Sequence, residues 1–296
     1  MATATLSGTE PMSEPAEKPP ENFCPAMAAN NNRPVRPESA CGSSRNCATV
    51  PGQTNSSTAG QHTVRTASPE EIQWLAEQSR RLESATAEEI LQWAVERYFP
   101  RFTMATGLGP EGCVIISMLA KIEPRVYVFN LDTGYQFPET LALRERIAEK
   151  YGIVVDLQRP ELSVQQYEAL NGGPVYKTDP DRCCFDRKVR VLHRVAANFD
   201  AWATGIRRDQ SPTRANTPIV KWDAKFGLVK ISPLANWTRK DVWRRIMEEG
   251  IPYNPLHDQG YTSIGCWPCT RPVGEGEDER AGRWSGTAKT ECGLHT

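Results

Sequence analysis

Four cysteines stand in two closely spaced pairs. Cys183 and Cys184 are adjacent, and Cys266 and Cys269 form a CxxC sequence. The turn inside a CxxC sequence can aim both thiolates at one metal centre. The side chains of adjacent residues diverge, which disfavours a single tetrahedral zinc ion, whereas a 4Fe-4S cluster offers each thiolate its own iron atom. The two pairs therefore predict a 4Fe-4S cluster, with a zinc site, a disulfide between the adjacent cysteines and four purely structural cysteines as open alternatives.

Cys292 lies in the last segment of the sequence, TECGLHT at 290–296, beside Gly293 and near His295. A short polar segment with no room for a further helix or strand places its thiol poorly for the core and well for movement. A frayed end with an incidental thiol would explain Cys292 on its own. Together with the two cysteine pairs, Cys292 indicates a nucleophile that reacts at one site and is then presented elsewhere.

Glycine-rich and arginine-rich loops provide groups that bind anions. The sequence TGLGPEG at 106–112 holds three glycines whose amides can turn toward an anion, and LDTGYQFPET at 131–140 offers polar groups that can bind a sugar or a phosphate. Arginine binds phosphate or sulfate through a planar fork of donors. Each loop alone is commonly a turn or a solvated surface, but together they indicate an anionic nucleotide pocket. The candidate substrate-binding residues in these loops are Thr106, Gly107, Gly109, Asp132, Thr133, Gly134, Arg207, Arg208, Arg214, Arg280 and Arg283.

Strands that alternate with helices must position these loops. Ser68, Pro69 and Glu71 form a helix start, and Thr86 with Glu89 forms a second one. Further helices are predicted from Pro138 to about Gly152, through Val189, Leu192 and Val195, and from Thr238 to Gly250. Strands are predicted at 112–119, 125–130, 153–157, 201–205 and 228–232. This alternation predicts an α/β fold with a mainly parallel sheet and helices on both faces. Such sheets bind ligands at the carboxyl ends of their strands.

Length and composition restrict the class of protein. A chain of 296 residues with a net charge of -1 and 39% hydrophobic residues can form one large domain or two small ones, and it has no general attraction to nucleic acid or an anionic membrane. No apolar run approaches the roughly 20 residues of a membrane span, and no secretory or transit signal is recognisable, so we expect a soluble, cytoplasmic protein. In a reducing cytosol, nine cysteines indicate metal or redox chemistry rather than a disulfide framework.

Residues 1–67 are rich in small and polar residues and contain few large apolar ones. We therefore expect a disordered tail, followed by one domain over 68–296 with a mobile C-terminal end. Cys24, Cys41 and Cys47 lie in the tail without nearby histidine partners and are interpreted as free thiols without a function.

Six motifs together resemble assimilatory adenylylsulfate (APS) reductase, the iron-sulfur branch of the phosphoadenylylsulfate (PAPS) reductase family. The motifs are CCFDRKV, GCWPCTRPV, TGIRRDQSPTR, LDTGYQFPET, ERAGRW and the terminal ECGLH. The resemblance implies an adenine-nucleotide alpha-hydrolase-like fold and reduction of a sulfonucleotide to sulfite and AMP in sulfate assimilation, with thioredoxin or glutaredoxin as electron donor. It further implies that Cys292 is the nucleophile and that the four paired cysteines hold the cluster. The implied substrate contacts are Lys188, Arg280, Arg283 and one arginine of the 207–214 loop.

The sequence also departs from this family, which leaves alternatives open. Relatives have a phosphate loop of the form SFSGAED where this chain has TGLGPEG, so PAPS, or both nucleotides, stay open as substrates beside the expected APS. PAPS reductases typically lack the cluster cysteines, which favours APS. An ATP pyrophosphatase or RNA thiolase of the same fold would show an SGGxDS loop, and a non-enzymatic metal-binding module would leave the arginine loops and Cys292 unexplained. Because the sequence ends just after ECGLH, we expect a separate protein as reductant; a homo-oligomer stays open.

Overall fold

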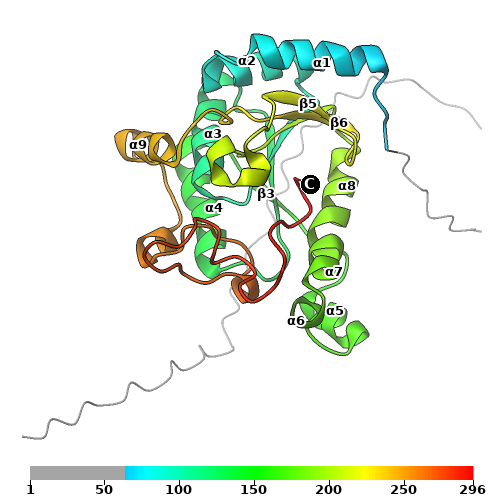
Figure 1. Cartoon of the computed structure of the whole chain (residues 1–296), viewed down its shortest axis with the longest axis vertical. Coiled ribbons are helices and arrows are strands. Elements are labelled where there is room, and N and C mark those ends of the chain that lie inside the picture. Colours follow the sequence, from blue (N-terminus) through cyan, green and yellow to red (C-terminus); the bar gives the residue numbers. More distant parts are fainter. Residues whose placement is uncertain (1–63, 296) are drawn as a thin grey trace, which may run out of the picture. The chain divides into compact units, whose positions relative to one another are not determined.

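The computed structural model describes residues 64–295 (Figure 1). Its strands form a six-stranded sheet in the order β3-β2-β1-β4-β6-β5. Neighbouring strands are parallel except β5, which runs antiparallel to β6 at the edge of the sheet. The prediction of a mainly parallel α/β sheet is confirmed. The strands are β1 (Phe102–Ala105), β2 (Tyr127–Leu131), β3 (Val155–Gln158), β4 (Ala201–Ala203), β5 (Val220–Asp223) and β6 (Leu228–Ile231).

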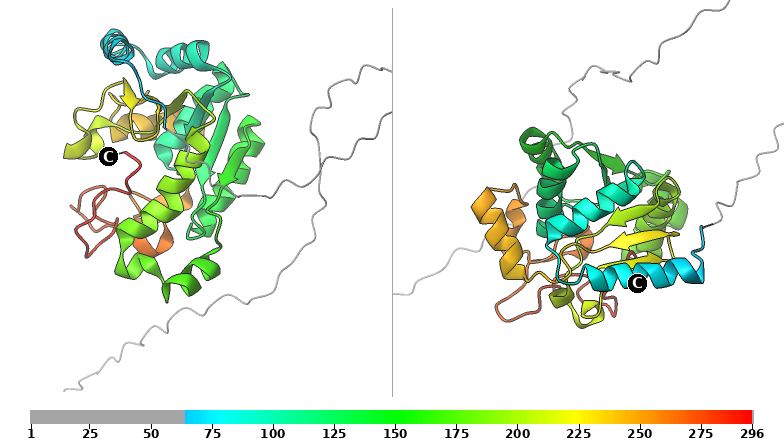
Figure 2. Two further views of the ribbon diagram at one scale, coloured as in Figure 1. Left: turned by 90° about the vertical axis from the view of Figure 1, so that its right-hand side faces the viewer. Right: turned by 90° about the horizontal axis from the view of Figure 1, so that it is seen from above.

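Helices lie on both faces of this sheet (Figure 2). They are α1 (Pro69–Arg81), α2 (Ala87–Tyr98), α3 (Pro110–Ile122), α4 (Pro138–Tyr151), α5 (Val164–Asn171), α6 (Val175–Thr178), α7 (Pro180–Cys184), α8 (Arg190–Ala196) and α9 (Arg239–Glu249). In β2, Val128 packs into a core with residues of α2, α3, α4 and α9, whereas Phe129 packs with residues of α8. Successive side chains of a strand point to opposite faces, so these helices divide between the two faces.

The predicted strand at 112–119 is wrong, because this segment lies within α3. Every residue from Gly112 to Leu119 is buried, so the helix is apolar on all sides and its sequence shows no helical period. Pro110 in the first turn is the signal that marks the helix start. The central strand β1 is a short segment that the sequence analysis does not identify. As a result, TGLGPEG at 106–112 follows the end of β1 and leads into α3.

The other predicted elements agree with the structure. Helices α1, α2, α4, α8 and α9 and strands β2, β3, β4 and β6 lie close to the expected residues. Strand β5 and helices α5, α6 and α7 are additional. Helix α7 continues through a π-helical turn (Phe185–Val189) into α8, so the stretch that contains Cys183, Cys184 and Lys188 is helical throughout.

The expected tail over 1–67 lies largely outside the described residues, as do Cys24, Cys41 and Cys47. The described part of that range, residues 64–67, contacts the domain, since Arg65 forms an ion pair with Glu71 and stacks on Trp222. Between residues 64 and 295, no helix has the length and apolar character that crossing a membrane requires.

Thr86→Ala is expected to lose about 1 kcal/mol of unfolding free energy, the usual cost of removing an N-cap side chain. At the start of α2 the Thr86 hydroxyl accepts a hydrogen bond from the Glu89 amide (3.2 Å), and the Glu89 carboxylate accepts one from the Thr86 amide (2.7 Å). Urea unfolding of variant and wild type measures the difference. Thr86→Ser keeps the hydroxyl and serves as the control. An equal loss in both variants would contradict the capping role.

Candidate active site

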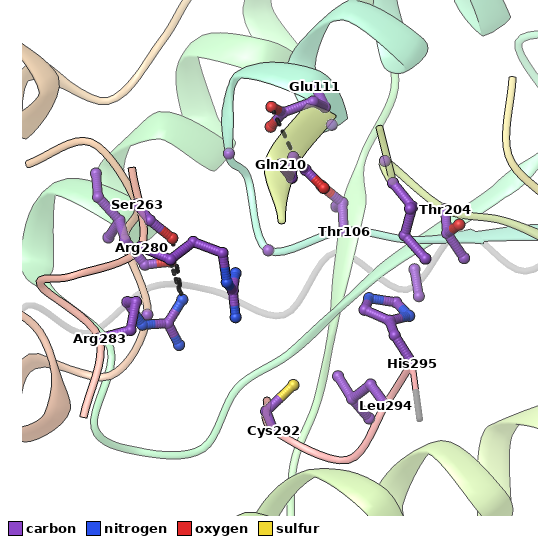
Figure 3. Close-up of a pocket in the computed structure, with 18 of the residues that line it drawn as sticks. Thr106, Glu111, Thr204, Gln210, Ser263, Arg280, Arg283, Cys292, Leu294 and His295 are labelled. Atoms are coloured by element: carbon purple, nitrogen blue, oxygen red, sulfur yellow. Dashed lines mark hydrogen bonds between the residues drawn. The ribbon is translucent and has the colours of Figure 1, made fainter. Parts of the chain in front are cut away.

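A cavity of about 240 Å³ opens at the carboxyl ends of β1, β2 and β4, where the sequence analysis expects a ligand (Figure 3). Its walls come from the β1–α3 loop, from residues that follow β4, and from three later segments, at 262–266, 279–284 and 291–295. We call this space the main cavity. Parallel strands bring their carboxyl ends to the same edge of the sheet, which explains why loops so far apart in sequence meet here.

The β1–α3 loop brings its backbone close to the main cavity. Leu108 has a φ of 56°, and its amide donates a hydrogen bond to the Thr106 hydroxyl (2.9 Å). A Cβ atom at Gly112 would lie 2.3 Å from that hydroxyl oxygen, so a larger residue does not fit there. Gly107 and Gly109 line the cavity where α3 begins, and the first amides of a helix favour an anion. The structure therefore brings the predicted contacts Thr106, Gly107 and Gly109 together.

Basic side chains line another part of the main cavity. They are Lys188, Arg214, Arg280 and Arg283. Arg214 and Arg280 both form ion pairs with the carboxylate of Glu291. Arg283 lies 4.4 Å from the centre of the Trp284 ring, and neither Arg283 nor Lys188 pairs with a carboxylate in the described part of the chain. One carboxylate thus offsets one of the two positive charges of Arg214 and Arg280, while Lys188 and Arg283 have no carboxylate partner among residues 64–295 and can attract an anionic ligand.

Two predicted substrate contacts, Arg207 and Arg208, do not line the main cavity, and their role as substrate contacts stays a prediction that their positions do not support. Arg207 is fully buried, and its guanidinium binds three carboxylates, those of Glu111, Asp209 and Glu279. Arg208 turns away and pairs with Glu83, between α1 and α2. Of the arginines in this loop, only Arg214 lines the cavity. The sequence cannot distinguish them, because the carboxylates that bind Arg207 and Arg208 come largely from distant segments.

Asp132, Thr133 and Gly134 do not line the main cavity either, so their assignment as nucleotide contacts stays a prediction. The Asp132 carboxylate pairs with Arg159 (2.8 Å) and accepts a hydrogen bond from the Gly134 amide (2.9 Å). The Thr133 hydroxyl lies 3.2 Å from the sulfur of Cys266. Thr133 therefore borders the cysteine-lined space, whereas Leu131, Gln136 and Thr140 of the same 131–140 stretch line the main cavity.

The four paired cysteines surround a second, smaller space, which we call the cysteine cavity. Cys183 and Cys184 end α7, Cys266 directly precedes a single 3-10 turn, and Cys269 is the last residue of that turn. Burial raises the pKa of Cys183 to about 12 and that of Cys269 to about 11, so thiolates at these positions need a positive partner. Among residues 64–295, no group of three or more His, Cys, Asp or Glu side chains is arranged to hold a metal ion. The structure nevertheless brings all four cysteines to one cavity.

Lys188 and Cys266 line both cavities and so connect them. Burial alone would lower the pKa of Lys188, but the electrostatic effect of three nearby cysteines outweighs burial and raises this pKa above its ordinary value. These cysteines are Cys266, Cys292 and Cys184. The ammonium group of Lys188 therefore stays protonated at the boundary between the two cavities.

Cys292 lies on the wall of the main cavity. Its side chain points into the space that Arg280, Arg283 and His295 also face (Figure 3). The thiol is half-buried rather than fully exposed. The predicted nucleophile and two of the predicted substrate contacts are thus side by side around one space.

Residues 290–295, which we call the C-terminal segment, are docked against the domain. The Lys225 ammonium donates a hydrogen bond to the Gly293 carbonyl (2.5 Å), Leu294 packs against the core beside α8, and the His295 ring stacks on Trp202 at 6.0 Å. Burial, followed by the charges of nearby cations, lowers the pKa of His295 well below its ordinary value, so the ring is neutral. These cations are Lys230, Arg214, Arg280 and Lys221. The contacts do not fit the alternative of a frayed end.

Residues 101–272 match the family described as the phosphoadenosine phosphosulfate reductase domain. The chain belongs to the phosphoadenosine phosphosulfate (PAPS) reductase family. The family expected from the sequence motifs is thereby confirmed.

Family members are similar to this chain over nearly their whole length. The adenosine 5'-phosphosulfate reductase of Streptomyces coelicolor is 48% identical over 227 residues, which are 76% of this chain and 95% of the relative. The phosphoadenosine 5'-phosphosulfate reductase of Gloeobacter violaceus is 46% identical over 220 residues, or 73% and 91% of the two chains. A crystal structure of the PAPS reductase of Candida auris is 30% identical, with a TM-score of 0.62 over 71% of this chain and 100% of that chain. The expected fold class is confirmed.

Glu291 is a site residue of this family member that the sequence analysis does not identify. It directly precedes Cys292 in the ECGLH motif, which is the signal that could have indicated it. Its partners Arg280 and Arg214 lie 11 and 77 residues away in sequence. Such pairing depends on the fold and has no local pattern.

Proposed function

We propose that this protein reduces adenylylsulfate to sulfite and AMP, with Cys292 as nucleophile and a dithiol protein, thioredoxin or glutaredoxin, as electron donor. The relatives are named for the reduction of a sulfonucleotide, which makes the chain an oxidoreductase that acts on a sulfur group. The observation that best supports the finer assignment is the position of Cys292 on the wall of a cavity with basic side chains, next to four clustered cysteines.

The reaction divides into two balanced steps. First, the Cys292 sulfur attacks the sulfonate sulfur of the nucleotide; a sulfur–sulfur bond forms, the sulfur–oxygen bond to AMP breaks, and AMP leaves. The product on the enzyme is a thiosulfonate. Second, one thiolate of the dithiol protein attacks the Cys292 sulfur and expels sulfite, and its second thiol then resolves the mixed disulfide. The dithiol supplies two electrons and leaves as a disulfide, while Cys292 returns as a thiol.

Arg283 and Lys188 are the side chains that we assign to the phosphosulfate group. Both line the main cavity, and neither is neutralised by a carboxylate from residues 64–295. A hydrogen bond to a charged group contributes roughly 1.5–3 kcal/mol. We assign the amides of the β1–α3 loop, near Thr106 and Gly107, to the remaining oxygens of the nucleotide.

The four cysteines fit a 4Fe-4S cluster as the resident cofactor. Their thiols line one cavity from four separate backbone positions, which matches a cluster with one iron for each thiolate. Lys188 and Arg283 line the same cavity and offset the negative charge of the thiolates. When bound, the cluster would supply delocalised negative charge beside Lys188 and would join α7 to the CxxC turn. The residues that would hold it are Cys183, Cys184, Cys266 and Cys269.

The other candidate functions have less support. An ATP pyrophosphatase or RNA thiolase is disfavoured because TGLGPEG stands where those proteins have SGGxDS. A non-enzymatic metal-binding module leaves the main cavity and Cys292 without a role. We propose a cytoplasmic location, because reactive free thiols persist in a reducing compartment.

APS is expected to be the preferred substrate, with kcat/KM at least about tenfold above that for PAPS. PAPS has one more phosphate group, which needs cations of its own. Arg214 and Arg280 share the Glu291 carboxylate, so among residues 64–295 the cations of the main cavity without a carboxylate partner are Arg283 and Lys188, which we assign to the phosphosulfate. Initial rates of sulfite release from both nucleotides, with the same thioredoxin, measure the ratio. An equal or higher efficiency with PAPS would refute the preference, and no sulfite from either nucleotide would refute the proposed function.

A further inference from the structure

Glu291 fastens the C-terminal segment to two parts of the main cavity. Its carboxylate accepts hydrogen bonds from Nε of Arg214 (3.0 Å), from a terminal nitrogen of Arg214 (2.9 Å) and from Arg280 (3.2 Å). Arg280 also donates to the Thr290 carbonyl (3.0 Å). Arg214 belongs to the loop after β4, and Arg280 belongs to the later segment at 279–284. One carboxylate therefore joins three stretches of the chain beside the reactive thiol.

These charged side chains are nearly enclosed by protein. The exposed fraction is 10% for the side chains of Arg214 and Glu291 and 19% for that of Arg280. Solvent ions screen an enclosed pair much less than an exposed one, and removal of one partner leaves the other charges buried without compensation. The Glu291 pairs therefore restrain the C-terminal segment far more than a surface ion pair would.

Glu291 is also the immediate neighbour of Cys292, so fixing its carboxylate fixes the approach of the thiol. On the other side of Cys292, Gly293 turns the chain with a φ of 80°, and Lys225 holds the Gly293 carbonyl (2.5 Å). Cys292 is thus held from both sides. Of these two anchors, Glu291 is the one that engages basic side chains of the main cavity itself.

We propose that Glu291 is a positioning residue that docks Cys292 for attack on the bound nucleotide. The inference rests on the function proposed above. In the docked state, Glu291 occupies Arg214 and Arg280 and leaves Lys188 and Arg283 for the substrate. When these pairs break, the segment is released and its thiol becomes accessible to a protein reductant. Glu291 acts through Cys292 and not through contact with the reacting atoms.

Glu291→Gln tests this role, because it removes the charge and keeps the shape of the side chain. On the anaerobically purified full chain we would measure adduct formation with saturating APS and no reductant, the dissociation constant for AMP, and the alkylation of Cys292 by iodoacetamide, resolved by peptide mass spectrometry. We expect adduct formation to slow at least about tenfold and alkylation to accelerate at least about tenfold, while AMP affinity stays within about threefold or tightens.

Two further variants sharpen the comparison. Glu291→Asp keeps the charge and shortens its reach, so its values should lie between those of wild type and Glu291→Gln. Glu277→Gln is the matched control, since Glu277 pairs with Arg271 (2.8 Å) at an exposed site that lines neither cavity. It should behave like the wild type in all three measurements.

The outcomes separate docking from other roles. Unchanged adduct formation and alkylation in Glu291→Gln would overturn the proposal. A lower KM for APS with unchanged kcat would also overturn it, because Glu291 would then only compete with the substrate for the arginines. Loss of AMP binding would mark Glu291 as a general structural residue and would reject the specific role. If the wild type itself forms no adduct with APS, the proposed function fails, whereas the alkylation rates still decide whether Glu291 docks the segment.

Discussion

Cys292→Ser is expected to release no detectable sulfite from APS, while it binds AMP with the affinity of the wild type and keeps the same iron content. A serine hydroxyl is a poor nucleophile toward sulfur and cannot form the sulfur–sulfur bond of the intermediate. The side chains assigned to the anion, Lys188 and Arg283, are unchanged, and Cys292 is not among the residues that line the cysteine cavity. The variant should therefore lose turnover but keep both AMP binding and iron content.

Mass spectrometry provides the direct measurement. Wild type incubated with APS and no reductant should gain the mass of one SO3 group, peptide mapping should place it on Cys292, and thioredoxin should remove it. Cys47→Ser, at a cysteine without an assigned role, is the control and should form the adduct normally. Direct attack of the reductant on the bound nucleotide would instead give no adduct, and Cys292→Ser would still produce sulfite. That result would reject the covalent mechanism.

Anaerobically purified wild type is expected to contain about four irons and four sulfides per chain, and Cys266→Ser is expected to lose most of both. Cys266 lines both cavities, and its sulfur lies 3.2 Å from the Thr133 hydroxyl, so it belongs to the inner wall of the cysteine cavity. Loss of the cofactor should also lower the unfolding temperature, because a bound metal centre would stabilise the fold to which its ligands belong.

Iron and sulfide analysis, together with the visible absorption of the protein, decides between the possible cofactors. Cys47→Ser should keep the iron and the brown colour, which controls for the loss of one thiol. One zinc ion per chain without sulfide would contradict the cluster and would favour a structural metal site. In that case the adduct experiment on Cys292 would still test the nucleophile independently.

The sequence allowed the two cysteine pairs to be predicted as one group, because residue type and the spacing within each pair are local features. An adjacent pair and a CxxC pair already indicate a shared metal centre, and the structure brings Cys183, Cys184, Cys266 and Cys269 to one cavity. Most helix starts were also predictable, since caps such as Thr86 with Glu89 lie within one turn of each other.

The errors arise where distant parts of the chain decide the outcome. Helix α3 is buried on every side, so its sequence lacks the polar face that would distinguish a helix from a strand. Arg207 and Arg214 come from one loop and look alike in sequence, yet Arg207 is enclosed by carboxylates while Arg214 reaches the cavity. The role of Glu291 likewise depends on two arginines that approach it only after folding.

Arg207 also affects how the chain segments around the main cavity open. Its guanidinium binds the start of α3 through Glu111, the loop after β4 through Asp209, and the later segment through Glu279. If one of these segments opened alone, the buried Arg207 guanidinium would lose one of its carboxylate partners. We therefore expect them to open as one cooperative unit. The cavity wall then loses its conformational entropy during folding and not on binding. A nucleotide therefore binds to a surface that needs little further ordering.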